Sequence, residues 1–204
     1  MVGSKSGKIQ IFDLGSGQLK EEIAAHEAEV WSLVTSPDSR TVLSGSSDKT
    51  VKFWEYELVP SEDGGRMLSI IHLKTLQLDE GVTCLSLSPD GRLIAVGLLD
   101  STVKVFFADT LKFFLSLYGH KLPVTVMDIS SDSTLIVTGS ADRNIKVWGL
   151  DFGDCHKSMF AHDDTITGLR FVPNTHMVFS AGKDGEVKQW DVDSFQRILT
   201  LKGS

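Results

Sequence analysis

Three sets of histidine, hydroxyl and aspartate side chains repeat along the chain at identical spacing, and each set ends in a tryptophan. In a hydrolase, a hydroxyl attacks the substrate, a histidine takes its proton and an aspartate orients the histidine. The three sets are His26, Ser44, Asp48 and Trp54; His120, Thr138, Asp142 and Trp148; and His162, Ser180, Asp184 and Trp190. Because one active site suffices for catalysis, three equivalent copies predict a structural role.

The four side chains of a set can satisfy one another's hydrogen bonds. An aspartate accepts from one imidazole nitrogen, while the hydroxyl bonds the other nitrogen and accepts from the indole N–H. Buried polar groups stabilise a fold when all of them are paired. We therefore predict three structural tetrads, with no catalytic residue, no metal ligand and no cofactor.

The aromatic residue that closes each repeat defines the period. Phe12, Trp54, Phe106, Trp148 and Trp190 are separated by 42, 52, 42 and 42 residues. Within a repeat, short runs that alternate apolar and polar residues are bounded by Ser, Asp, Gly and Pro, as expected of four short strands. A period of about 40–45 residues is typical of a β-propeller blade. We predict an all-β fold.

The phase of the repeat predicts how the chain is divided. Residues 1–204 are expected to form one propeller fragment, with a partial blade at 1–25 and blades at about 26–77, 78–119, 120–161 and 162–204. About four and a half blades suggest an arc of a larger ring, and a smaller closed ring of five blades is the alternative. An isolated arc is expected to self-associate through unpaired sheet faces.

Two segments depart from the regular repeat. One repeat has Leu78, Val96 and Phe106 at the tetrad positions and keeps only Asp100, so apolar packing is expected to replace the polar set there. The long gap contains ten extra residues at 58–67, rich in Pro, Ser, Glu, Asp and Gly. We predict that they form a solvated loop between the third and fourth strands.

An aromatic pair is a candidate for partner docking. On the predicted outer strand within 112–120, strict alternation places Phe114 and Tyr118 on the face that carries Lys20 and Glu22 in the first repeat. Exposed aromatic side chains are enriched in the centres of protein interfaces. We predict an exposed pair, and packing against the adjacent blade is the alternative.

Composition excludes several classes of function. The chain has 27 acidic and 20 basic residues, giving a net charge of −7, which argues against nonspecific wrapping of nucleic acid but leaves a local basic patch possible. Cys84 and Cys155 form no disulfide framework, which favours a reducing compartment. We find no apolar run long enough for a membrane span, no phosphate-binding loop and no paired motif for zinc.

The tetrads and the period resemble those of the WD-repeat family. Residues 78–124 and 139–164 are, more specifically, similar to the Dip2/Utp12-type subunits of the small-subunit processome. That resemblance implies part of the second of two tandem propellers, and a non-enzymatic scaffold that works in pre-18S rRNA processing in the nucleus and nucleolus. It also implies other processome proteins as partners and indirect or local contact with pre-rRNA and small nucleolar RNA, with no membrane and no small-molecule substrate. An adaptor such as a ubiquitin-ligase substrate receptor is the alternative, and a hydrolase is a third.

Overall fold

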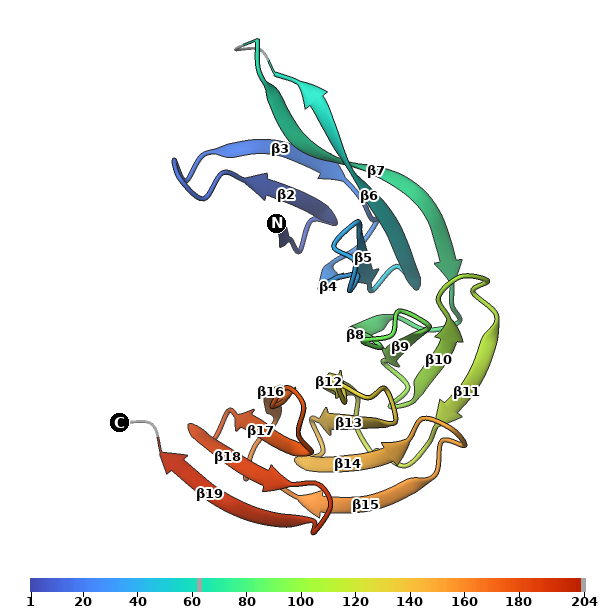
Figure 1. Cartoon of the computed structure of the whole chain (residues 1–204), viewed down its shortest axis with the longest axis vertical. Coiled ribbons are helices and arrows are strands. Elements are labelled where there is room, and N and C mark those ends of the chain that lie inside the picture. The colour runs from blue at the N-terminus through green and yellow to red at the C-terminus, as the bar shows by residue number, and fades with distance from the viewer. Residues whose placement is uncertain (62–63, 203–204) are drawn as a thin grey trace. The chain divides into compact units, whose positions relative to one another are not determined.

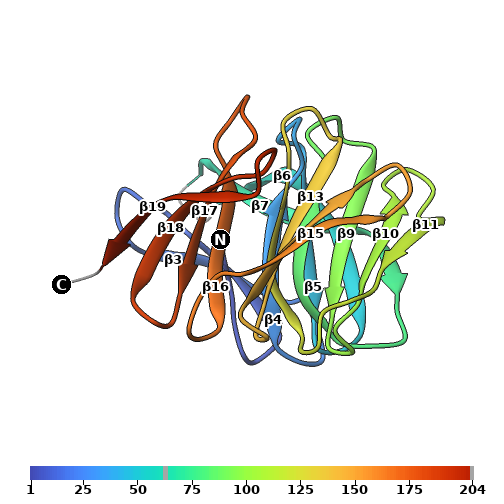
Figure 2. The ribbon, with the colours of Figure 1, turned by 90° about the horizontal axis from the view of Figure 1, so that it is seen from below.

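The computed structural model describes residues 1–61 and 64–202, and regular structure in these residues consists of β-strands. The strands form five antiparallel sheets, in each of which neighbours along the chain are neighbours in the sheet (Figures 1 and 2). Alternating apolar and polar residues separated by tight turns favour this arrangement. The described residues contain no helix that is long and apolar enough to cross a membrane. The prediction of an all-β chain is confirmed.

The first compact unit, Met1–Val82, contains two sheets. One has three strands and the other has four. The strands are β1 (Val2–Gly3), β2 (Lys8–Phe12) and β3 (Leu19–Ala24), followed by β4 (Val30–Thr35), β5 (Thr41–Ser46), β6 (Thr50–Pro60) and β7 (Arg66–Gln77). Buried side chains from both sheets, including Ile9, Val42 and Trp54, form one apolar cluster.

The second compact unit, Thr83–Ser204, contains three four-stranded sheets. Its first strand begins at the last residue of the first unit. The strands are β8 (Val82–Leu87), β9 (Leu93–Leu98), β10 (Val103–Phe107) and β11 (Phe113–Leu117); β12 (Val124–Ile129), β13 (Leu135–Ser140), β14 (Asn144–Gly149) and β15 (Cys155–Phe160); and β16 (Ile166–Phe171), β17 (Met177–Gly182), β18 (Glu186–Asp191) and β19 (Gln196–Lys202). The sheets follow the predicted repeat, whereas the proposed blade boundaries stay a prediction.

Apolar faces of neighbouring sheets pack together inside the second unit. Met127 and Trp148 belong to a buried cluster that also contains residues of β8–β11. On the other side of β12–β15, Val147 shares a cluster with Leu169 and Trp190 of β16–β19. Removing these apolar faces from water is the main favourable contribution to the fold.

The turn between the two middle strands of each four-stranded sheet, and the equivalent turn between β1 and β2, has a residue with positive φ. That position is held by Gly7, Lys49, Ser101, Arg143 and Gly185, with φ between 69° and 81°. A Cβ atom at Gly7 would lie only 2.2 Å from the carbonyl oxygen of His26. Glycine at this turn therefore allows a close backbone approach as well as the left-handed conformation.

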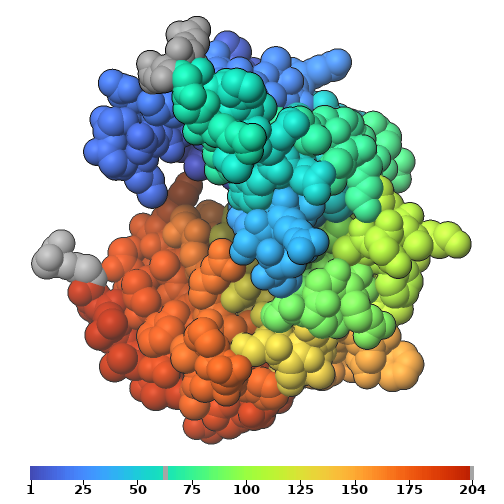
Figure 3. All heavy atoms as spheres, turned by 45° about the horizontal axis from the view of Figure 1, so that its top comes forward, coloured from blue at the N-terminus to red at the C-terminus, as the bar shows by residue number. Residues whose placement is uncertain are grey.

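The ten-residue insertion differs from its prediction. Instead of a loop across 58–67, its two ends extend β6 and β7 as a paired hairpin in which Leu58 lies opposite Leu68 and Pro60 opposite Arg66. Figure 3 shows this hairpin in teal on the surface of the first unit. Cross-strand pairing of apolar residues at both ends explains why strands continue into a segment of loop-like composition. Residues 62–63 lie outside the described part of the chain.

Candidate functional site

The third tetrad shows how the predicted side chains meet in the second unit. The carboxylate of Asp184 lies 3.0 Å from Nδ1 of His162, and Nε2 of the same ring lies 2.8 Å from Oγ of Ser180. Nε1 of Trp190 donates to that Oγ at 2.8 Å. The histidine enters from the loop before β16, the serine lies on β17, the aspartate in the following turn and the tryptophan on β18.

The other two sets have the same connections. In the first unit, His26 lies 2.9 Å from Asp48 and 2.7 Å from Ser44, which accepts from Trp54 at 2.8 Å. In the second set, the corresponding distances are 2.9, 2.8 and 2.9 Å among His120, Asp142, Thr138 and Trp148. Threonine replaces serine without changing the network.

Hydrogen-bond roles follow from the aspartate, because an ionised carboxylate can only accept. Nδ1 of His26 therefore donates to Asp48. Nε2 of a neutral ring then accepts from the Ser44 hydroxyl, whose oxygen in turn accepts from Nε1 of Trp54. In all three networks Nδ1 is the ring nitrogen that faces the carboxylate.

Burial and hydrogen bonding set the charges in these networks. Burial lowers the pKa of His26 and of His120 against the opposing effect of their aspartates. Burial alone would raise the pKa of Asp48, but hydrogen bonds from Thr50, His26 and the backbone N–H of Glu27 outweigh it and the pKa is lowered. The tetrads of His26 and His120 thus pair a ring whose pKa is lowered with an aspartate whose pKa is also lowered.

The connections match those of a hydrolase triad, but the hydroxyl groups are buried. Ser44 and Thr138 are 0% exposed and Ser180 is 1% exposed. A nucleophile must approach a substrate carbonyl and have oxyanion donors near it. In this structure each hydroxyl is instead enclosed by a tryptophan and a histidine, so its position suits a structural bond.

The repeat without a tetrad keeps only its turn residue. Leu78, Val96 and Phe106 are buried apolar side chains. Asp100 still accepts from the backbone N–H and the hydroxyl of Thr102, at 3.0 and 2.7 Å. Asp100 therefore caps the turn of this repeat through Thr102, in a repeat whose tetrad position holds Leu78 instead of a histidine.

The two members of the predicted aromatic pair differ in exposure, and packing against the core, the alternative, holds for Phe114. Tyr118 is 70% exposed, but Phe114 is half-buried, packs against the core and lies 5.0 Å from the ring of Phe107. The register explains the difference, because Leu115 pairs with Val105 and Phe113 with Phe106, leaving Phe114 as the extra residue of a β-bulge. The docking role of both residues stays a prediction.

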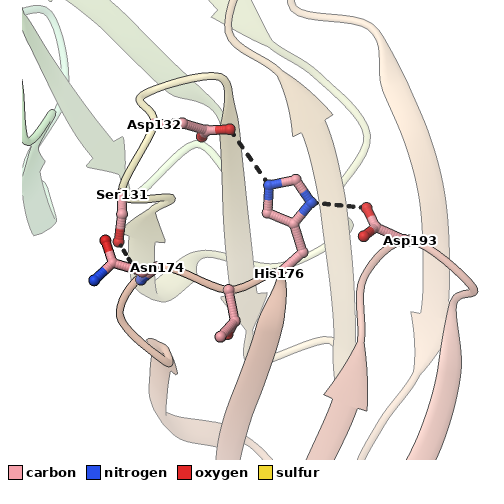
Figure 4. Close-up of a pocket in the computed structure, with 6 residues that line it drawn as sticks. Ser131, Asp132, Asn174, His176 and Asp193 are labelled. Atoms are coloured by element: carbon pink, nitrogen blue, oxygen red, sulfur yellow. Dashed lines mark hydrogen bonds and ion pairs between the residues drawn. The ribbon is translucent and has the colours of Figure 1, made fainter.

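A polar hollow of about 400 Å³ in the second unit was not anticipated from the sequence. Figure 4 shows His176 between two carboxylates, with Nδ1 2.8 Å from Asp193 and Nε2 3.4 Å from Asp132. The hydrogen bond to Asp193, and to a smaller extent the one to Asp132, raises the pKa of His176. The 42-residue period was the available signal, since it places the turns near Asp132 and Asn174 at equivalent positions in adjacent sheets.

The described cysteines and acidic side chains are not clustered as metal ligands. Within residues 1–61 and 64–202, no group of three His, Cys, Asp or Glu side chains is arranged to hold a metal ion. Both cysteines are free, and burial raises the pKa of Cys84 to about 12. Cys155 is exposed.

Comparison with known proteins relates the chain to one family. The family described as the WDR3 second beta-propeller domain matches residues 1–204. WD repeat-containing protein 3 from Homo sapiens is 59% identical over 125 residues, which are 61% of this chain and 13% of the human protein. U3 small nucleolar RNA-associated protein 12 from Saccharomyces cerevisiae is 50% identical over 131 residues, or 61% of this chain and 14% of the yeast protein.

These relatives are much longer than the segment that they share with the chain, since the matched part covers 13% or 14% of their length. The family match extends over all 204 residues. Together with the four-stranded antiparallel sheets, it confirms the predicted WD-repeat propeller fold. The chain belongs to the family of WDR3 second β-propeller domains.

Proposed function

We propose that the chain is a non-enzymatic scaffold module in small ribosomal subunit biogenesis, acting within the small-subunit processome during pre-18S rRNA processing. The observation that carries this proposal is the family match across residues 1–204. Support comes from the yeast relative, whose name states an association with U3 small nucleolar RNA. We place the module in the nucleus and nucleolus on the same grounds.

The proposed partners are other processome proteins. A net charge of −7 disfavours extensive direct binding to an RNA backbone, so contact with pre-rRNA or small nucleolar RNA is proposed to be indirect or local. Antiparallel sheets joined by exposed turns present surfaces to which several partners can bind. Tyr118, with its exposed ring, is one proposed contact.

The proposed role of the tetrads is to hold the connections of each repeat in place. Their buried hydroxyl groups support this role rather than hydrolysis. A fluorophosphonate probe, which labels activated serines, should not label Ser44 or Ser180 in the folded protein. Labelling of either residue, mapped by mass spectrometry, would contradict the structural role.

Affinity purification of the intact protein tests the scaffold proposal. The tagged protein should recover box C/D small nucleolar RNA, pre-18S rRNA and processome subunits, whereas untagged cells serve as the control. Treatment with ribonuclease should leave the direct protein partners bound. Recovery of cullin-type ligase subunits without nucleolar RNA would refute the proposal and favour an adaptor in another pathway.

A further inference from the structure

A hollow of about 440 Å³ lies between the sheets β8–β11 and β12–β15 of the second unit. Its lining includes the apolar side chains of Leu93, Phe107, Phe114, Leu135 and Leu150. Leu93 and Leu150 are buried and the other three are half-buried, so the apolar surface remains accessible from solvent. An accessible apolar floor of this kind can hold one side chain of a partner.

β-bulges build part of this lining. Phe114 is the extra residue of the bulge in β11, and His156, one period of 42 residues later, is the extra residue of the bulge in β15. Both line the hollow. A bulge redirects a side chain from strict alternation, and here the two bulges place an aromatic ring and an imidazole in the same hollow.

The surroundings of the apolar floor are acidic. Asp90 and Asp151 line the hollow, and a smaller adjoining hollow that shares Phe107 is lined by Asp109. Arg92 lines both hollows and lies 3.9 Å from Asp90, so its guanidinium offsets part of the negative charge of that carboxylate. The lining therefore carries three carboxylates and one guanidinium.

A further carboxylate lies at one end of the floor. A Cβ atom at Gly149 would meet Asp151, Asp154 and His156 within 2.7–3.0 Å, so the missing side chain leaves space for these groups to gather. Asp154 is 60% exposed and lies 3.1 Å from Nε2 of His156. The negative charge thus continues beside the apolar surface.

We propose that this hollow is a docking groove for a basic segment of a partner protein, in which one apolar side chain is flanked by lysine or arginine residues. The apolar side chain fills the floor beside Phe107 and Phe114, and the flanking cations face Asp109 and Asp151. Complementary charge gives such a contact its specificity and its rate of association. This docking groove rests on the proposed scaffold role, since it specifies the chemistry of one partner that the scaffold would bind.

Fluorescence anisotropy with short labelled peptides tests the groove on the full chain. The probe has a central leucine between lysines; a second peptide replaces leucine by serine, and a third replaces the lysines by glutamates. The first should bind, and the other two should bind about tenfold more weakly or not at all. Equal binding of the serine peptide, or no binding of the leucine peptide, would overturn the proposal.

Charge reversal on the protein locates the site. The variant Asp109→Lys/Asp151→Lys should weaken binding of the leucine peptide about tenfold. The matched control Asp163→Lys/Asp164→Lys makes the same change in net charge at exposed positions outside the groove, and should change binding less than about twofold. The groove variant removes two bonds from backbone N–H groups, those to Asp109 and Asp151, and the control removes one, that to Asp164, so circular dichroism melts of both variants accompany the binding measurement.

Two results would overturn the site assignment. One is equal weakening by both charge reversals, with circular dichroism melts that match the parent. The other is displacement of the leucine peptide by a short single-stranded RNA, which would indicate a nucleic-acid surface. If the groove variant does not bind the peptide but still recovers nucleolar RNA in affinity purification, the docking segment is dispensable and the scaffold proposal stands. If the parent protein itself recovers no nucleolar RNA, the scaffold proposal is refuted.

Discussion

Replacing Ser180 by alanine should destabilise the chain more than removal of an exposed hydroxyl. Oγ of Ser180 bonds both His162 and Trp190 at 2.8 Å, and these residues are 0% and 6% exposed. The substitution leaves a buried indole N–H and a buried imidazole nitrogen without partners. Each unpaired buried group costs about 1–3 kcal/mol, so we expect the free energy of unfolding to fall by about 3 kcal/mol.

Two further variants separate the hydrogen bonds from side-chain volume. Ser180→Thr should restore most of the loss, because Thr138 makes the same two bonds at 2.8 and 2.9 Å. Ser194→Ala, which removes an exposed hydroxyl bonded to Asp191 at 2.7 Å, should cost less than about 0.5 kcal/mol. Urea unfolding followed by tryptophan fluorescence measures all three.

The repeat without a tetrad supplies a third comparison. The triple variant His162→Leu/Ser180→Val/Trp190→Phe gives the third repeat the side chains that the β8–β11 repeat has at these positions. Because the imidazole, the hydroxyl and the indole N–H are removed together, it should be more stable than Ser180→Ala. If Ser180→Ala changes the free energy of unfolding by less than about 0.5 kcal/mol, the argument from unpaired buried groups is refuted.

Other properties of the chain lead to three more predictions. Burial lowers the pKa of His26 and His120 below the ordinary 6.5, so the stability that they contribute is present above pH 6.5 and is lost as the pH falls below it. The urea midpoint of unfolding should therefore decrease when the pH is lowered from 7.5 to 5.5. The decrease should be steeper in His176→Gln, because the raised pKa of His176 stabilises the fold at low pH and the variant lacks this group. A rising midpoint would contradict this. Replacing residues 58–68 with Asn-Gly keeps the cross-strand register next to the turn and should shift the melting temperature by less than about 4 °C; collapse of the fold would show that the extension is structural. Leu201 is 52% exposed on the outer strand of the last sheet, and Leu201→Lys should reduce self-association measured by light scattering, whereas unchanged association would place the contact elsewhere.

Much of the tetrad geometry follows from spacing in the sequence. His162 and Ser180 recur at the same distance from a turn aspartate as their counterparts in the other repeats. Antiparallel strands joined by tight turns convert a fixed separation along the chain into a fixed separation in space. The spacing alone therefore predicts that the polar sets meet.

At the insertion and at Phe114, residue spacing and composition predict the wrong local structure. Composition favours a loop at 58–67, but cross-strand contacts such as Leu58 with Leu68 extend the hairpin. Alternation places Phe114 with Tyr118, but the bulge between Val105 and Phe106 breaks the alternation. Both outcomes depend on the partner strand, which a single strand's residue pattern does not describe.

The sequence by itself determined the period of the repeat, its strands and the side chains that form each tetrad, because these depend on residue type and on spacing within one sheet. Only the tertiary structure decided which surfaces stay open. The hollow beside Phe107 and the contact of His176 with Asp132 arise where residues about 42 positions apart meet across neighbouring sheets. Exposure at such places depends on the packing of two sheets and on the bulges at their edges.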